Sequence, residues 1–243
     1  RTMLAKSAKE PMTEYEKGLP NVAFGPQKIE KTLAEVLAEN NLTQLHIAET
    51  EKYAHITYFL NGGKEEQLTG EDWTLVPSIK TPRHEEYPGM RAAEIAQKIL
   101  DVLNEDKYDF IAVNFANADM VGHSGDYRAT IEAIEAVDKA IGRIHKEVLE
   151  RGGILIITAD HGNAEEKLNP MTGETKTEHT SNPVPVYLAG NQFAAAAGAA
   201  RIPLIQRKEI SGALADIAPT VLELLGLSKP PQMTGQSLLK FLK

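Results

Sequence analysis

Short apolar runs alternate with amphipathic stretches along much of this chain, and that alternation limits the folds it can adopt. Residues 110–115 (FIAVNF) and 154–158 (ILIIT) have the length and side chains of buried strands, and residues 127–150 between them carry apolar side chains at helical spacing. Strands separated by helices predict an α/β fold with a mostly parallel sheet and helices on both faces. Such sheets place their functional residues at the carboxyl ends of the strands.

The remaining elements are predicted from the same two periodicities. We expect helices over residues 28–39, 90–104 and about 213–225, and strands over Leu45–Ala48, His55–Leu60 and Val184–Leu188. Residues 64–89 contain three prolines and are expected to be irregular. Residues 193–200 (FAAAAGAA) are low in complexity and are expected to form a helix or a surface loop.

Composition excludes several classes of function. The net charge is −8 and the sequence contains no cluster of Lys and Arg residues, so we expect no nucleic-acid partner. No apolar run reaches the ~20 residues of a membrane span, and the first residues lack the apolar core of a signal peptide, so we expect no membrane partner. The chain has no cysteine. Disulfides and thiolate metal sites are therefore excluded, and we expect a reducing, cytoplasmic compartment.

Aspartate and histidine follow two of the predicted apolar strands directly. Asp119 and His123 come after the first strand, and Asp160 and His161 come after the second. Charged side chains at the end of a buried strand need a partner because desolvating them is costly, and a divalent metal is such a partner. His179 adds a third imidazole in a later loop, just before another predicted strand. Carboxylates and imidazoles suit Mn²⁺ or Zn²⁺, and two such ions could clamp the oxygens of a phosphoryl transfer.

Each of these residues also has a more ordinary interpretation when it is taken alone. Asp119 could be a turn or cap residue, His123 a packed or solvated histidine, and Asp160 with His161 a polar pair in a loop. The joint pattern of two Asp/His pairs and a third histidine favours metal binding over these alternatives. The other histidines are predicted to be structural: His46 and His55 in strands, His145 on a helix and His84 in a loop.

Lys52 lies just after the predicted strand Leu45–Ala48 and therefore belongs to the same rim of the sheet. A lysine at that rim could hold a phosphate as a compact point charge. Taken alone, a solvated lysine paired with Glu49 or Glu51 is the more ordinary interpretation.

Several segments of the chain resemble the signature segments of the cofactor-independent phosphoglycerate mutases, which belong to the alkaline phosphatase superfamily. They are VAFGPQ, AETEKYAHIT, FLNGG, NFANADMVGHSGD, TADHGNAE, EHTSNPVPVYLAG and APTVLELLG, in the order in which the family has them. The resemblance implies an alkaline-phosphatase-like fold and a monomeric enzyme that interconverts 3-phosphoglycerate and 2-phosphoglycerate. It implies a phosphoserine intermediate and two metal ions, usually Mn²⁺. The resemblance assigns Asp119, His123 and His179 to one ion, and Asp160 and His161 to the other. It places Lys52 beside the transferred phosphoryl group.

The resemblance also implies what these residues lack. The family's serine nucleophile, a further aspartate ligand and the substrate-holding arginines lie before the matched region, and no serine of this chain matches that nucleophile. We therefore expect residues 27–243 to be the C-terminal part of the metal-binding domain, without its N-terminal segment and its inserted second domain. Residues 1–26 are expected to be the hinge or tail of that inserted domain. The missing segment of the same protein is then an expected partner, and the chain alone should be inactive as a mutase.

Two alternatives stay open at this point. Another enzyme of the same superfamily, such as a phosphatase, phosphodiesterase or phosphopentomutase, would share the metal ligands. A metal-binding module without catalysis would fit the absence of a nucleophile.

Overall fold

A computed structural model of the chain describes residues 29–169, 171–193 and 212–241. Nearly all of them lie in one compact unit, Lys31–Lys243. The expectation of a hinge or tail over 1–26 lies outside the described residues, as does most of the low-complexity run 193–200. Among the described helices, none combines the length and the apolar character that a membrane span requires.

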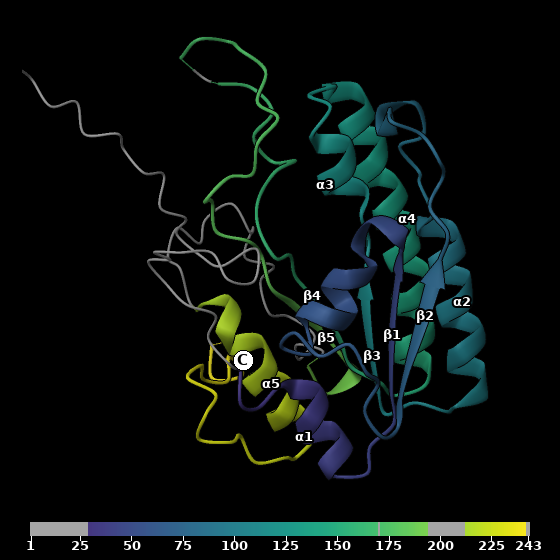
Figure 1. Cartoon of the computed structure of the whole chain (residues 1–243), viewed down its shortest axis with the longest axis vertical. Coiled ribbons are helices and arrows are strands. Elements are labelled where there is room, and N and C mark those ends of the chain that lie inside the picture. The colour runs from purple at the N-terminus through teal and green to yellow at the C-terminus, as the bar shows by residue number, and fades with distance from the viewer. Residues whose placement is uncertain (1–28, 170, 194–211, 242–243) are drawn as a thin grey trace, which may run out of the picture. The chain divides into compact units, whose positions relative to one another are not determined.

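A parallel sheet with the strand order β2-β1-β3 organises this unit (Figure 1). β1 (Gln44–Glu49) lies between β2 (Glu71–Val76) and β3 (Phe110–Asn114), and all of its residues are buried. A separate antiparallel pair is formed by β4 (Leu155–Ile157) and β5 (Tyr187–Ala189). Because β1 and β3 run in the same direction, the segments that follow them begin at the same edge of the sheet.

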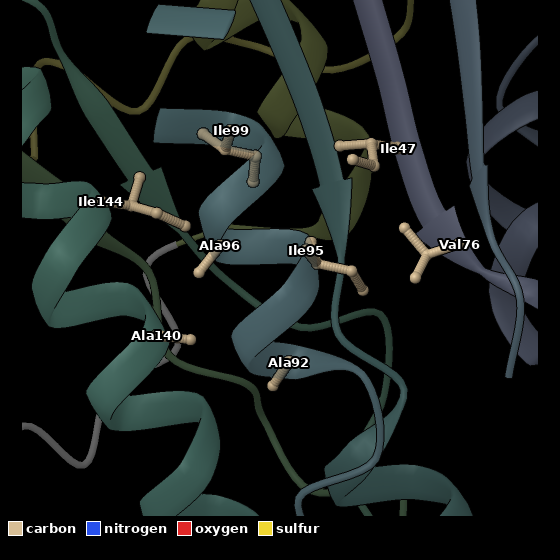
Figure 2. Close-up of a cluster of buried hydrophobic side chains, with 8 residues drawn as sticks. All are labelled: Ile47, Val76, Ala92, Ile95, Ala96, Ile99, Ala140 and Ile144. Atoms are coloured by element: carbon tan, nitrogen blue, oxygen red, sulfur yellow. The ribbon is translucent and has the colours of Figure 1, made fainter. Parts of the chain in front are cut away.

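Two helices cover one face of the parallel sheet. α2 (Ala92–Glu105) and α4 (Tyr127–Glu150) pack on each other and on the sheet, where Ile95 and Ile144 belong to the same buried cluster as Ile47 of β1 (Figure 2). The predicted helix over 127–150 is confirmed with its bounds. The side chain of Asp126 caps the first turn of α4 by accepting a hydrogen bond from the backbone of Ala129.

Two shorter helices, α1 (Leu33–Glu39) and α5 (Ile217–Leu224), pack together in a second cluster. Phe110 of β3 packs against this second cluster, whereas its neighbour Ile111 packs against the first. Since successive side chains of a strand point to opposite faces, the two clusters lie on opposite faces of the sheet. The α/β class with a mostly parallel sheet and helices on both faces is therefore confirmed.

The predicted strand over His55–Leu60 is wrong, because residues His55–Phe59 form a π-helix that follows the short 3₁₀ turn Thr50–Lys52. Parallel strands need a connection that returns to the opposite end of the sheet, and a helical turn makes this return compactly. Only Thr57 of the π-helix is buried, and its hydroxyl donates to the carbonyl of Tyr53. Of the apolar residues that suggested a strand, Tyr58 and Phe59 are exposed and Ile56 and Leu60 are half-buried.

The prediction that residues 64–89 are irregular is also wrong, because β2 lies within them. This strand opens with two acidic residues, and acidic residues are uncommon in strands. Glu71 is nevertheless buried, since its carboxylate accepts hydrogen bonds from the side chains of Asn61 and Trp73 and from the backbone of Leu68. His46 of β1 completes this buried group, with its Nδ1 atom 3.2 Å from Glu71 Oε1.

The strand predicted over Ile154–Thr158 is shorter than expected, and it is half-buried rather than buried on both faces. Within the described residues β4 pairs on one edge only, with β5. β5 also starts later than the predicted Val184–Leu188, because Pro183 and Pro185 have no backbone N–H to donate to a ladder. The predicted helix at about 213–225 begins with a 3₁₀ turn, Leu214–Asp216, before α5.

Candidate metal centre

Asp119 and His123 lie on a short helix, α3 (Asn117–Gly122), which begins three residues after β3. This helix was not among the elements predicted from the sequence. Six residues are too few to show a helical period in the sequence, so the pattern gave no signal for α3. His123 is the C-cap residue, and its backbone N–H donates to the carbonyl of Asp119. The helical spacing of four residues places the two side chains on the same side of α3.

His179 joins this pair from the loop that precedes β5, which confirms that it does not lie on a helix. Its Nε2 atom lies 3.0 Å from Asp119 Oδ1 and 3.1 Å from His123 Nε2, and His123 Nε2 is 3.1 Å from the same oxygen. The three atoms thus form a nearly equilateral triangle. Ligands held ~2.1 Å from one ion at octahedral or tetrahedral angles lie ~3.0–3.4 Å apart. The triangle has the dimensions of one face of a coordination polyhedron.

The protonation of His123 fits the same role. Its Nδ1 atom is 2.6 Å from the carbonyl oxygen of Thr177, and a carbonyl can only accept, so Nδ1 carries the proton. In the neutral ring, Nε2 then presents a lone pair to Asp119 and His179. A metal-binding histidine characteristically donates its other N–H to a carbonyl or a carboxylate in this way.

Asp119 is held by hydrogen bonds to both of its carboxylate oxygens. Lys52 Nζ lies 2.5 Å from Oδ2, and Asn163 Nδ2 lies 2.9 Å from Oδ1. Burial raises the pKa of Asp119, but the hydrogen bonds from Lys52 and Asn163 and the charge of Lys52 outweigh it and bring the pKa to about 2. The carboxylate is therefore ionised at neutral pH, as a metal ligand must be.

Lys52 is buried and bound to Asp119, so its interpretation as a solvated lysine paired with Glu49 or Glu51 is wrong. The carboxylate of Glu49 instead accepts hydrogen bonds from the hydroxyl of Ser78 and the backbone N–H of Arg91. The 3₁₀ turn that follows β1 carries the lysine toward α3. Its ammonium group therefore lies beside the triangle of ligand atoms.

Asp160 and His161 border the triangle without entering it. The ring of His161 stacks on that of His179, with 3.8 Å between the ring centroids and 26° between the planes. Asp160 is about half exposed, and its Oδ2 atom lies 3.6 Å from His161 Nε2. In the described part of the chain, Asp119, His123 and His179 are the group of three or more carboxylates and imidazoles whose ligand atoms lie close enough together to share one ion.

Two residues near the centre were not singled out from the sequence. Asn163 follows the Asp160-His161 pair closely, and that proximity was an available signal. Lys167 is buried next to the centre, and the sequence gives no sign of this, because nothing about a lone lysine in a polar loop indicates burial.

His55, which was predicted to be structural, lies close enough to the site to feel its charges. Partial burial and the charge of Lys52 lower its pKa, while the charges of Asp160 and Asp119 oppose this shift.

Comparisons with known proteins identify the family of this chain. The family model described as the metalloenzyme superfamily matches residues 5–229. The 2,3-bisphosphoglycerate-independent phosphoglycerate mutase of Clostridioides difficile is 50% identical over 230 residues, which are 94% of this chain and 43% of that protein. The enzyme named 2,3-bisphosphoglycerate-independent phosphoglycerate mutase 2 in Methanosarcina barkeri is 50% identical over 229 residues, 94% of this chain and 41% of that protein.

A solved structure is similar as well. The phosphoglycerate mutase of Leishmania mexicana, crystallised at low cobalt concentration, matches with a TM-score of 0.76 and 31% identity over 93% of this chain and 43% of its own. The resemblance inferred from the signature segments is thus confirmed. The chain spans less than half the length of the curated relatives it matches.

Proposed function

Since this chain belongs to the metalloenzyme superfamily, we propose that it supplies the metal-binding part of a 2,3-bisphosphoglycerate-independent phosphoglycerate mutase. The whole protein would interconvert 3-phosphoglycerate and 2-phosphoglycerate through a phosphoserine. One observation carries the proposal: three ligand atoms, from Asp119, His123 and His179, form a triangle of metal-binding dimensions beside the ammonium group of Lys52. Relatives that share half of their matched residues with this chain carry the name of that enzyme.

Asp119, His123 and His179 would hold one divalent ion, which when bound supplies positive charge to the transferred phosphoryl group and lowers the pKa of a hydroxyl beside it. Lys52 provides a second, fixed positive charge at the same place. A lysine ammonium group can donate to several phosphoryl oxygens, and its charge counts more in a partly desolvated site than in water. Since Asp119 already holds the lysine, substrate binding need not order a free side chain.

The finer assignments belong to the same proposal. Asp160 and His161 would contribute to a second ion and receive their remaining partners from the part of the protein that the relatives have and the matched region does not cover. Manganese suits both sets of ligands, because imidazoles and carboxylates without a thiolate favour borderline to hard metals. We also propose a role in glycolysis, a cytoplasmic location and a monomeric parent enzyme, as the resemblance implies.

The test is to join this chain to the part of a relative that lies outside the matched region. The portion of the Clostridioides difficile relative that precedes the matched region would be fused to this chain, and mutase activity would be assayed with Mn²⁺. We expect turnover by the fusion protein, loss of turnover in its His179→Ala and Lys52→Met variants, and none by the chain alone. His145→Gln, on α4, serves as a matched histidine control and should keep the activity.

Three outcomes would contradict the proposal. Native-like turnover by the chain alone would show that no residue outside it carries the phosphoryl group. A folded fusion protein that binds Mn²⁺ but does not turn over phosphoglycerate would refute the assigned reaction. Turnover of simple phosphate esters or pentose phosphates, with no turnover of phosphoglycerate, would favour another enzyme of the superfamily.

A further inference from the structure

Lys167 is a buried cation next to the metal centre. It lies in the loop that follows β4, and 3% of its surface is exposed. Its ammonium group donates to two oxygens, the carbonyl of Gly122 at 3.0 Å and the side-chain oxygen of Asn163. Within the described residues it forms no ion pair at salt-bridge distance. Its two hydrogen-bond partners are thus neutral.

Such a lysine is costly to the fold. Burial lowers the pKa of Lys167, and the charges of Glu165 and Asp119 offset this only in part. A methionine would fill the same volume without the cost of desolvating a charge. The hydrogen bonds that the ammonium group donates to Gly122 and Asn163 offset part of this cost, and an apolar side chain could not make them.

The first contact determines the orientation of the Asn163 amide. An ammonium group can only donate, so the oxygen of the amide must face Lys167. The NH₂ group then faces Asp119 and donates to Oδ1 at 2.9 Å. The reverse orientation would set a donor against Lys167 and an acceptor against Asp119, leaving both contacts repulsive. The oxygen that receives this hydrogen bond is the one that belongs to the triangle with His123 and His179.

The second contact fixes the end of α3. Gly122 is the residue before His123, so its carbonyl anchors the backbone from which that ligand projects. The approach is close, because a Cβ atom on Gly122 would lie 2.5 Å from Asn163 Oδ1. Lys167 thus links the loop after β4 to α3 directly at Gly122 and, through Asn163, at Asp119.

We propose that Lys167 is a positioning residue of the metal centre: it fixes the amide of Asn163, and through it the Asp119 carboxylate, in the orientation that binds the ion. The inference rests on the proposed function, since it takes the triangle of Asp119, His123 and His179 as the metal site. Residues that orient a ligand in this way change metal affinity ~10- to 100-fold when they are replaced.

The experiment is a calorimetric titration of the 243-residue chain with Mn²⁺. We expect Lys167→Met and Asn163→Ala each to weaken binding ~10- to 100-fold. Because Lys167 acts on Asp119 through Asn163, the double variant should lose less affinity than the sum of the two single losses. Lys176→Met is the matched control, since that lysine lies in the same loop but pairs with Glu166. His179→Ala should abolish binding.

A second measurement needs no metal and reports on the amide itself. In a ¹⁵N-labelled metal-free chain, the side-chain NH₂ signals of Asn163, identified by their loss in Asn163→Ala, should be shifted by the hydrogen bond to Asp119. They should move toward the position of a free amide in Lys167→Met and stay in place in Lys176→Met. This readout decides between a positioning role and a general loss of stability.

The outcomes separate the two proposals. Wild-type binding that is lost in His179→Ala but unchanged in Lys167→Met would overturn the role of Lys167 and leave the metal site intact. Equal and additive losses from Lys167→Met and Asn163→Ala would show that Lys167 does not act through the amide, and would overturn it as well. A wild-type chain that binds no Mn²⁺ would refute the proposed centre, and the role of Lys167 with it.

Discussion

Gly122→Ala is expected to destabilise the protein, although alanine normally favours a helix. In a helix interior, alanine is about 0.5–1 kcal/mol more favourable than glycine. Here the new Cβ atom would lie 2.5 Å from Asn163 Oδ1 and 3.0 Å from Asn163 Cγ. Asn163 cannot yield freely, because it is held by Lys167 on one side and Asp119 on the other. Overpacking of this kind costs about 1–3 kcal/mol, and after the alanine gain is subtracted we expect a net loss of about 1 kcal/mol.

Gly142→Ala is the matched control for this prediction. Gly142 lies inside α4, and a Cβ atom there would meet nothing within 4 Å. The same substitution should therefore stabilise the fold by about 0.5–1 kcal/mol. Urea unfolding curves of the wild type and both variants measure the two changes. Stabilisation by Gly122→Ala equal to that by Gly142→Ala would show that Asn163 is free to move, and would refute the tight contact between α3 and the loop after β4.

Three further predictions concern the scaffold. Glu71→Gln should destabilise the fold by about 2–3 kcal/mol in urea unfolding, because the new NH₂ group must face a donor whichever way the amide lies: the backbone N–H of Leu68, or the side chains of Asn61 and Trp73; a loss under about 1 kcal/mol would contradict this. Asp126→Ala should cost about 1 kcal/mol by removing the N-cap of α4, and an unchanged urea midpoint would argue against that cap. Backbone N–H groups hold the pKa of Asp216 below 3.8, so its stabilisation is present above that pH and is lost as the pH falls through the lowered pKa. The difference in melting temperature between the wild type and Asp216→Asn should therefore shrink from about pH 6 to about pH 3, and a constant difference would contradict it.

The long elements of this fold were predictable because their patterns extend over many residues. The helix 127–150 has a capping aspartate before it and a glycine pair after it, and its apolar face repeats over several turns. The shorter elements depend on contacts that the local sequence does not show. β2 opens with Glu71, which is buried only because Asn61, Trp73 and Leu68 donate to it from elsewhere. α3 is too short to show a period, and the π-helix at His55–Phe59 has the composition of a strand.

The candidate site was predictable in its residues and less so in its connections. Asp119 and His123 were identified because they follow an apolar strand, and His179 because it completes the set of ligands. The parallel pairing of β1 with β3 brings Lys52 to Asp119, and the loop between β4 and β5 brings His179 to Asp119 and His123. The position of Lys167 depends on tertiary packing alone, because a lysine in a polar segment has no local signal of burial.

Crystals of this chain grown with Mn²⁺, with anomalous diffraction recorded at the manganese absorption edge, would test the central claim most directly. The account predicts an anomalous peak bonded to Asp119 Oδ1, His123 Nε2 and His179 Nε2, with Asn163 donating to Asp119 Oδ1 as it does here. A peak bonded to other residues, or no peak in crystals where these three side chains are ordered, would contradict the claim that this chain carries the metal centre.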